Sequence, residues 1–253
     1  MSRVGFIGTG HIAAPMARLL AREGHEVVVS ERNAGVAADL ANAGLGIKVA
    51  SNQGVVDTSD VVFLCLRPAV WADVVAPLTF QADQKIVSVM AGVPMADIAK
   101  ACAPVTEISA TVPYGFLENG GCPLPVVGDP TVLTALFGST NIVLPQENEA
   151  ALTYHFAASA LAAGAVAILE TSASWLGDKI GDDAKAEVYM SNLIFGILRE
   201  LDKNDAGVLR AEREALATPN TLNLKMVEGL DAAGVYGAVH DMHDKILKSM
   251  EAS

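Results

Sequence analysis

The chain has 253 residues, of which 51% are hydrophobic and 18% charged, a composition typical of folded proteins and not of disordered ones. Its formal net charge of −12 argues against general nucleic-acid binding, which needs a basic face, but leaves room for a local basic pocket for a phosphate. The three cysteines, Cys65, Cys102 and Cys122, show neither CxxC spacing nor a disulfide framework, so we expect a reducing, cytoplasmic setting.

The first part of the chain alternates short apolar runs with amphipathic segments. The amphipathic segments predict helices at 11–24 and 34–44, which end at Gly24 and Gly44. The run "DVVFLCL" (60–66) is almost entirely apolar, as expected of a strand covered on both faces. The predicted strands are 4–8, 26–30, 47–50, 60–66, 85–91, 105–110, 124–128 and 141–145. Strands that alternate with helices predict an α/β domain with a parallel, doubly wound sheet.

After residue 146 the pattern changes to helices alone. Helical periodicity covers 147–177, 183–203, 205–217, 220–233 and 236–251. We therefore predict two domains, an α/β domain at 1–146 and an all-α domain at 147–253.

The most membrane-like segment is "FAASALAAGAVAIL" (156–169). It is shorter than the roughly 20 apolar residues that a membrane-spanning helix needs. Its small side chains suit a helix buried at a subunit interface, so we expect no membrane association.

A glycine cluster lies between the first predicted strand and the first helix, in "VGFIGTGHIAAPMA". Gly8 permits a tight turn, Gly10 lets the backbone approach a pyrophosphate, and Ala13 allows the helix to pack closely on the strand. The helix N-terminus then presents free N–H groups and a favourable dipole to the phosphates. With Thr9, His11 and Ile12 between and after the glycines, this segment predicts a dinucleotide-binding Rossmann domain.

The end of the second strand, "VVVSERN", bears on the choice between NAD and NADP. An NAD site usually has an acidic residue about twenty positions after the glycines, and this position is Ser30. Ser30, Arg32 and Asn33 together suit a 2′-phosphate, which Arg32 would bind through its charged guanidinium fork. We predict NADP, as NADPH; Glu31, whose carboxylate would favour NAD if turned inward, keeps NAD possible.

Three further segments resemble the pyrroline-5-carboxylate reductase family. "FLCLRP" (63–68) resembles the strand that ends in Lys-Pro in these reductases, with Arg67 in the lysine's place. "VSVMAGVPMADIAKA" (87–101) resembles their Ser-Ile-Ala-Ala-Gly-Val segment. "ATPNTLNLKMVEGLDAAGVYGAV" (217–239) matches, without a gap, their Ser-Pro-Gly-Gly-Thr-Thr helix, their Leu-Glu-x-x-Gly-Phe turn and their last helix.

This resemblance implies an NADP-dependent oxidoreductase that transfers hydride between NADPH and a cyclic imine such as 1-pyrroline-5-carboxylate, the reaction of proline biosynthesis. It also implies a homodimer formed through the helical domain, with the substrate between the cofactor domain and the helices of the dimer. Leu66, Arg67 and Pro68 would line the adenosine or nicotinamide-ribose side, and Ala91 and Gly92 would lie near the nicotinamide.

The substrate-facing segments depart from the family's pattern. "SALAAG" replaces Gly-Ser-Gly-Pro-Ala-Tyr and leaves Ser159, "ATVP" replaces Pro-Asn-Thr-Pro and puts Thr111 at the amide position, and "NTLN" replaces Gly-Gly-Thr-Thr and ends in Asn223. By resemblance, substrate contacts come from Thr111, Ser159, Thr221 and Asn223, with Thr221 and Asn223 as the catalytic candidates. The alternative interpretation of Asn220, Thr221 and Asn223 is helix capping.

Other polar residues have structural as well as functional interpretations. Tyr114, Tyr154 and His155 are candidate proton donors or simply satisfied core residues. In "HDMHD", His240 and His243 lie on one helix face, but no further ligand set is evident, so we predict no metal site.

Two classes of alternative stay open. "GFIGTGHIAAPMARLL" also resembles the 3-hydroxyisobutyrate dehydrogenase group, which expects a Gly-x-x-Gly-x-x-x-Lys pattern near residue 165, whereas the first lysine in this region is Lys179. An imine reductase or a 3-hydroxyacid dehydrogenase-like enzyme acting on another small substrate is therefore one alternative. The other is a non-catalytic NADP-binding protein, because the substrate hydroxyls are lost beside an intact phosphate loop.

Overall fold

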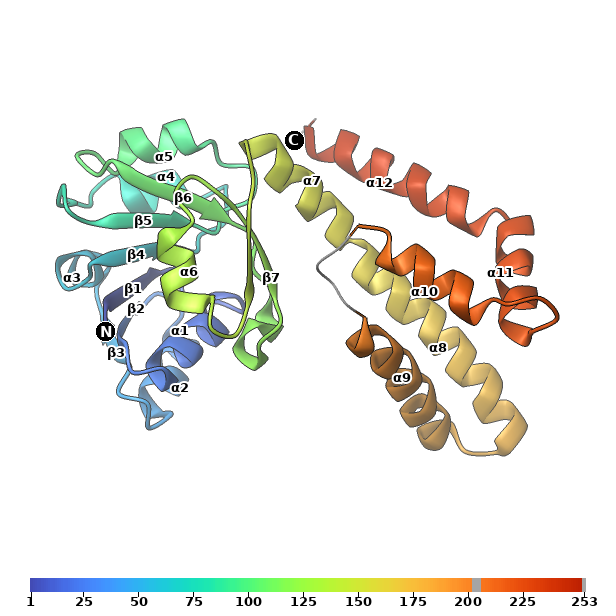
Figure 1. The fold of residues 1–253 in the computed structure, drawn as a ribbon. Coiled ribbons are helices and arrows are strands. Elements are labelled where there is room, and N and C mark those ends of the chain that lie inside the picture. The colour runs from blue at the N-terminus through green and yellow to red at the C-terminus, as the bar shows by residue number, and fades with distance from the viewer. Residues whose placement is uncertain (202–205, 252–253) are drawn as a thin grey trace. The chain divides into compact units, whose positions relative to one another are not determined.

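The computed structural model describes residues 1–201 and 206–251. It divides the chain into two compact units, Met1–Phe156 and Ala157–Ser253. The first is an α/β domain and the second is all-α, as the sequence predicts (Figure 1). The units divide within helix α7 (Glu149–Ser159), because the first turn of α7 is tied to the α/β domain: the Met95 N–H donates to Oε2 of Glu149 at 2.9 Å.

The first unit is built on an eight-stranded sheet with the order β3-β2-β1-β4-β5-β6-β7-β8. Its strands are β1 (Arg3–Ile7), β2 (Glu26–Ser30), β3 (Lys48–Ala50), β4 (Val61–Leu64), β5 (Lys85–Ser88), β6 (Glu107–Thr111), β7 (Pro123–Val127) and β8 (Ile142–Pro145). Neighbouring strands are parallel except β6 and β7, which are antiparallel. The predicted parallel, doubly wound sheet is confirmed except at this one ladder, where the connection at 112–122 is shorter than a parallel crossover, which needs a dozen or more residues.

Helices cover both faces of this sheet. They are α1 (Ala13–Arg22), α2 (Ala34–Asn42), α3 (Asn52–Asp57), α4 (Trp71–Val75), α5 (Met95–Ala101), α6 (Thr131–Phe137) and the 3₁₀ helix η1 (Gly115–Asn119). The predicted helices at 11–24 and 34–44 correspond to α1 and α2.

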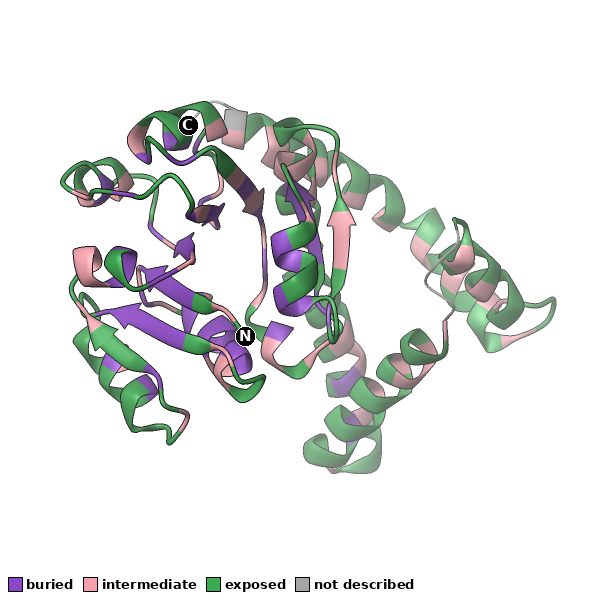
Figure 2. Ribbon diagram, turned by 60° about the vertical axis from the view of Figure 1, so that its left-hand side comes forward, coloured by how far each residue is buried: buried purple, intermediate pink, exposed green. Residues whose placement is uncertain are grey.

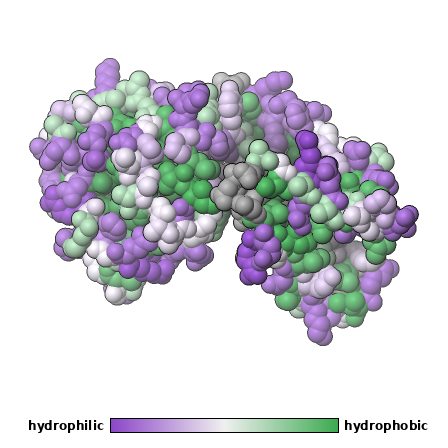
Figure 3. All heavy atoms as spheres, in the orientation of Figure 1, coloured by the Kyte–Doolittle hydropathy of each residue, from purple (hydrophilic) through white to green (hydrophobic). Residues whose placement is uncertain are grey.

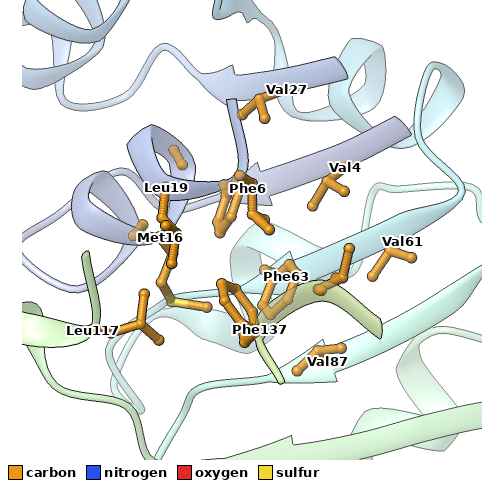
Figure 4. Packing of buried hydrophobic residues seen from close by; sticks show 14 of the residues in the cluster. Val4, Phe6, Met16, Leu19, Val27, Val61, Phe63, Val87, Leu117 and Phe137 are labelled. Carbon is orange, nitrogen blue, oxygen red and sulfur yellow. The ribbon is translucent and has the colours of Figure 1, made fainter. Parts of the chain in front are cut away.

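The central strands carry two hydrophobic cores, one on each face of the sheet. Phe6 and Phe63 belong to one cluster, and their sequence neighbours Ile7 and Leu64 to the other, as the twofold side-chain period of a strand requires. Phe6 stacks on Phe63 with ring centroids 4.9 Å apart, and Phe137 meets Phe63 edge-on at 6.1 Å (Figure 4). Burial is concentrated in this sheet and its covering helices (Figure 2). The two cores fix the positions at which the strands end.

The helical unit buries few side chains. It contains the end of α7, then α8 (Leu161–Ile180), α9 (Asp183–Glu200), α10 (Val208–Leu216), α11 (Leu222–Ala232) and α12 (Val235–Glu251). Among its described residues, the buried apolar side chains are three alanines, Ala157, Ala173 and Ala186. Trp175, Tyr189 and Phe195 are instead 64%, 58% and 62% exposed, and apolar side chains gather on the surface of this unit (Figure 3).

One helical stretch, Glu149–Ile180, is long and apolar enough by length and composition to cross a membrane. The segment 156–169 thus lies within a longer helical stretch than its own length predicts, because α7 and α8 continue each other with a break at Ala160. Only 6% of the most apolar window in this stretch is buried. Core and interface helices of soluble proteins have the same composition, so this surface is expected to be covered, by lipid or by protein.

Glu118 fixes the loop after β6 onto helix α1. Its carboxylate accepts hydrogen bonds from Nε of Arg18 at 2.9 Å and from Nη2 of Arg18 at 2.6 Å, and it pairs with Nη2 of Arg22 at 2.8 Å. The hydrogen bond from Arg18 is the main cause that holds the pKa of Glu118 below its usual value. Because the Glu118 side chain is only 14% exposed, this ion pair is poorly screened by solvent.

We expect Glu118→Gln to lower the free energy of unfolding by about 1–2 kcal/mol at neutral pH, because charge-assisted hydrogen bonds from two arginines are lost. The lowered folded-state pKa means that this contribution is present above the ordinary carboxyl pKa and disappears as the pH falls through the lowered value. Urea unfolding from about pH 7 to about pH 3 should show the two proteins converge at the acid end.

The control for this measurement is Glu107→Gln. Glu107 pairs with Lys85 at 2.7 Å but is 51% exposed, so its loss should change stability by less than about 1 kcal/mol. A stability difference for Glu118→Gln that stays constant across the pH range would contradict the assignment.

Candidate dinucleotide site

A groove of about 560 Å³ opens at the carboxyl ends of β1, β2 and β4. Because β1 lies between β2 and β4 in the sheet, the loops after these three strands meet at one crevice, the place where open α/β sheets bind ligands. The groove is lined by Gly8, Thr9, Gly10, His11, Arg32, Asn33, Cys65, Leu66, Arg67 and Val70.

The two glycines of the first turn have different surroundings. Gly8 has φ +94°, and a Cβ on it would lie 2.3 Å from the carbonyl oxygen of Cys65. A Cβ on Gly10 would meet nothing within 4 Å. Gly8 is therefore required by the fold itself, whereas Gly10 keeps an open stretch of backbone that faces the groove.

Ser30 braces the glycine turn. Its Oγ accepts a hydrogen bond from the Gly8 N–H at 2.9 Å, and the Thr9 hydroxyl donates to the Ser30 carbonyl at 2.8 Å. The Ser30 side chain is fully buried. This burial contradicts the expectation that Ser30 contacts a 2′-phosphate directly; its hydroxyl holds the turn after β1 to the end of β2.

The charged lining of the groove is wholly cationic. Arg32 and Asn33 line the groove, and Glu31 between Ser30 and Arg32 does not. The other ionisable lining groups with a basic side chain are His11 and Arg67, and no Asp or Glu is among the lining residues. The local charge is thus opposite in sign to the net charge of −12. A positive groove suits the 2′-phosphate of NADP, whereas an NAD site would need a carboxylate for the ribose 2′-hydroxyl.

Several predicted cofactor residues lie outside this lining, and two unpredicted ones lie in it. Ile12, Ala13, Ser30, Pro68, Ala91 and Gly92 do not line the groove. Ala13 is 1% exposed and packs α1 on the sheet, the role predicted for it. Cys65 and Val70 line the groove without having been predicted. Cys65 follows the apolar run of β4, and burial raises the pKa of its thiol, so it meets the groove as a neutral group.

Thr111, at the end of β6, has an unsatisfied hydroxyl. The residue is 3% exposed, and its Oγ1 has no hydrogen-bond partner among the described residues. A buried hydroxyl without a partner costs about 1–3 kcal/mol, so a ligand or an ordered water is expected there. The loop that follows lies on the start of α1, where a Cβ on Gly115 would be 3.7 Å from the carbonyl oxygen of His11.

The other predicted substrate residues belong to the helical unit. Thr221 is the N-cap of α11: its Oγ1 accepts from the Leu224 N–H at 3.2 Å and donates to the Thr218 carbonyl at 2.7 Å. Its single hydroxyl proton is therefore given to the backbone in this structure, which agrees with the capping interpretation.

Asn223 and Ser159 are also placed by their helices. The side-chain amide of Asn223 donates to the Leu216 carbonyl at 3.2 Å, and the residue lines an apolar pocket of about 300 Å³ formed by α9, α10 and α11. Ser159 is half-buried at the end of α7. Asn220 has φ 68° and makes the turn into α11.

The remaining candidate proton donors differ in their hydrogen bonds and in their exposure. Nδ1 of His155 lies 2.7 Å from the Ala151 carbonyl, and Tyr154 is 55% exposed. Tyr114 is half-buried and stacks on a neighbouring aromatic ring. Nδ1 of His240 lies 3.9 Å from Oδ2 of Asp244, and no three potential metal ligands gather among the described residues.

Comparison with known proteins identifies the fold. The family described as NADP oxidoreductase coenzyme F420-dependent matches residues 3–92, which contain the whole groove. A 1-pyrroline-5-carboxylate reductase from Streptococcus pyogenes is 20% identical, with a TM-score of 0.84 over 100% of this chain and 99% of that one. The chain has the fold of a pyrroline-5-carboxylate reductase. The resemblance seen in the sequence is thus confirmed at the level of the fold.

Two further structures are similar. The pyrroline carboxylate reductase of Plasmodium falciparum, determined with NADP bound, is 14% identical, with a TM-score of 0.80 over 99% of this chain and 97% of that one. An imine reductase from Pseudomonas sp. is 18% identical, with a TM-score of 0.62 over 99% and 92%. Comparison with curated proteins gives no match. The fold is therefore shared by structures described as pyrroline-5-carboxylate reductases and by one described as an imine reductase.

The two glycines of the groove provide a matched pair of substitutions. Gly8→Ala should lower the free energy of unfolding by more than about 2 kcal/mol, because the new Cβ meets the Cys65 carbonyl at a positive φ. Gly10→Ala should leave stability within about 1 kcal/mol of the wild type but weaken dinucleotide binding at least about tenfold, because the methyl group occupies open groove.

Thermal unfolding and titration with NADPH measure the two effects separately. A destabilised Gly10→Ala protein, or one that binds NADPH as tightly as the wild type, would contradict the roles assigned to these glycines.

Proposed function

We propose that this protein is an NADPH-dependent reductase that transfers hydride to the carbon of a cyclic imine, with 1-pyrroline-5-carboxylate as the first candidate substrate. The observation that carries the proposal is the cationic, carboxylate-free groove at the glycine turn, in a chain with the fold of pyrroline-5-carboxylate reductases. With this substrate the reaction would belong to proline, and hence amino-acid, biosynthesis.

The cofactor would be held by the backbone on one side and by side chains on the other. The N–H groups after Gly8, in the glycine turn and in the first turn of α1, would bind the pyrophosphate, since the Gly8 N–H itself donates to Ser30. Arg32 and Asn33, after β2, would bind the 2′-phosphate, whose extra charge is what distinguishes NADPH from NADH. Ala91 and Gly92, after β5, would border the nicotinamide, which supplies the hydride when the cofactor is bound.

The chain's own contribution to catalysis would be positioning. Hydride transfer to an iminium carbon needs a flat substrate held against the nicotinamide and hydrogen-bond donors for its polar groups. The buried hydroxyl of Thr111 at the end of β6, which has no hydrogen-bond partner among the described residues, would be such a donor or acceptor. Ser159 and Asn223 are proposed as further substrate contacts, and Thr221 as the cap that positions Asn223.

A second candidate function is the reduction of another imine or carbonyl compound. It is favoured by Asn223, whose amide is bonded to the backbone where the family pattern has a threonine hydroxyl. The similarity of the fold to an imine reductase supports the same reading.

We further propose a cytoplasmic homodimer formed through the helical unit. A second copy would cover the apolar surface that contains Trp175, Tyr189 and Phe195, because a unit whose buried apolar residues are alanines lacks a core of its own. The same cover would account for the exposed, apolar helical stretch Glu149–Ile180 without lipid. Cys65, Cys102 and Cys122 are free thiols, which fits a reducing compartment.

Light scattering in buffer without detergent tests the homodimer. The expected result is twice the chain mass, and Trp175→Glu together with Phe195→Glu should shift the protein toward monomer or aggregate. A monodisperse wild-type monomer, or a protein that stays in solution only with detergent, would contradict the proposal.

Consumption of NADPH with a panel of substrates tests the activity. The expected result is turnover of 1-pyrroline-5-carboxylate or of another cyclic imine, with NADPH preferred to NADH and with little oxidation of small 3-hydroxyacids. Tight NADPH binding without turnover of any imine or carbonyl compound would instead indicate a non-catalytic, cofactor-binding protein.

Thr111→Val provides the matched variant for the active protein. The substitution keeps the shape but removes the unpartnered hydroxyl, so the stability should stay equal or rise, by up to about 1 kcal/mol. If the hydroxyl binds substrate, kcat/KM should fall by about tenfold or more, with NADPH affinity unchanged. A variant with full activity would remove Thr111 from the site.

A further inference from the structure

The arginines of the α/β unit fall into two groups. Three of them are paired with carboxylates: Arg3 with Asp60, and Arg18 and Arg22 with Glu118. Arg32 and Arg67 form no ion pair among the described residues, and these two line the dinucleotide groove. The net charge of the chain is −12, so carboxylates outnumber basic groups; even so, the two arginines of this unit that have no ion pair within the described part of the chain both line one groove.

The two unpaired arginines come from opposite sides of the glycine turn. Arg32 follows β2 and Arg67 follows β4, and β1 lies between these strands in the sheet. Both side chains are exposed, so their guanidinium groups are solvated and available. No Asp or Glu lines the groove, so an anion bound there meets positive charge from both strand ends and no lining carboxylate.

We propose that Arg67 is a second specificity-determining residue, and that it and Arg32 hold the same 2′-phosphate from opposite walls of the groove. This inference rests on the proposed function: if the protein prefers NADPH, Arg67 would be one of the residues that cause the preference. The pyrophosphate carries one charge on each phosphate and has backbone N–H groups at the glycine turn. A phosphate monoester carries a charge of about −1.5 to −2 near neutral pH, which two guanidinium groups match.

The rival role for Arg67 is stacking on the adenine ring, which both NADPH and NADH contain. The two roles differ in what the loss of Arg67 does to the ratio of the two affinities. A contact to the 2′-phosphate is lost only from NADPH, whereas a stacking contact is lost equally from both cofactors.

The test is the measurement of Kd for NADPH and NADH by titration of wild type, Arg67→Ala, Arg67→Lys and Arg32→Ala. For Arg67→Ala we expect the NADPH affinity to fall on the order of 10- to 100-fold and the NADH affinity to change less than about threefold. The NADPH affinity of Arg67→Lys should lie between those of the wild type and Arg67→Ala, because lysine keeps the charge but lacks the planar fork. In the double variant Arg32→Ala/Arg67→Ala, the two losses of NADPH binding free energy should not add, because both arginines contact one phosphate.

Adenosine 2′,5′-bisphosphate and adenosine 5′-monophosphate provide the same comparison for the adenosine end alone. The matched control is Lys100→Ala, which removes an exposed positive charge of α5 outside the groove. It should leave unchanged the ratio of the NADPH and NADH affinities and the ratio of the affinities for the two adenosine phosphates. Thermal unfolding of each variant should match the wild type, because both arginines are exposed and unpaired among the described residues.

The outcomes separate this inference from the proposed function. An equal fall of NADPH and NADH affinity in Arg67→Ala overturns the inference and leaves the reductase proposal intact. The expected change of ratio without turnover of any imine supports the inference and overturns the proposed activity. A wild-type protein that prefers NADH, or binds neither cofactor, overturns both.

Discussion

The site depends on how the turn at Gly8 is wedged between the ends of β2 and β4. On one side the Gly8 N–H donates to the buried hydroxyl of Ser30, and on the other the Cys65 carbonyl occupies the space of a Gly8 side chain. Both neighbouring strands are themselves fixed by hydrophobic cores on two faces of the sheet. The backbone that would face a pyrophosphate is thus held in place before any ligand binds, which lowers the entropy that binding has to overcome.

Much of this fold can be predicted from the sequence, because continuous apolar runs and glycine-ended helices have strong patterns. The same patterns do not encode strand direction, which is why the antiparallel ladder between β6 and β7 could not be foreseen. The five-residue α4 is too short to show helical periodicity. The place where the units divide depends on the contact from Met95 to Glu149, which are 54 residues apart in sequence.

The site was predictable in its position along the chain but not in the direction of its side chains. Spacing from the glycines located the end of β2, yet it could not show that Ser30 turns into the sheet while Arg32 faces the groove. Cys65 and Val70 reach the groove from a strand that is adjacent only in space. Thr221 was ambiguous for another reason: capping and catalysis select the same residue types, and only the hydrogen bonds to Leu224 and Thr218 separate them.

The residues left unsatisfied in the single chain indicate what kinds of partner are missing. Within the described residues, Thr111 lacks a hydrogen-bond partner, Arg32 and Arg67 lack counter-charges, and the aromatic surface around Trp175 lacks apolar cover. Each of these groups has a different chemistry: a hydroxyl is satisfied by a hydrogen bond, a guanidinium group by an anion, and an apolar surface by apolar cover.

Some polar groups have hydrogen-bond partners within the fold, so their use for a ligand has a cost in stability. The Ser30 hydroxyl accepts from the Gly8 N–H, and the Thr221 hydroxyl donates to the Thr218 carbonyl. The Glu118 carboxylate binds two arginines. Using any of them for binding or proton transfer would first break an interaction that holds the fold, at about 1 kcal/mol or more for each hydrogen bond. Residue type alone does not separate these groups, since threonine occurs on both sides: Thr111 has no hydrogen-bond partner among the described residues, whereas Thr221 has two.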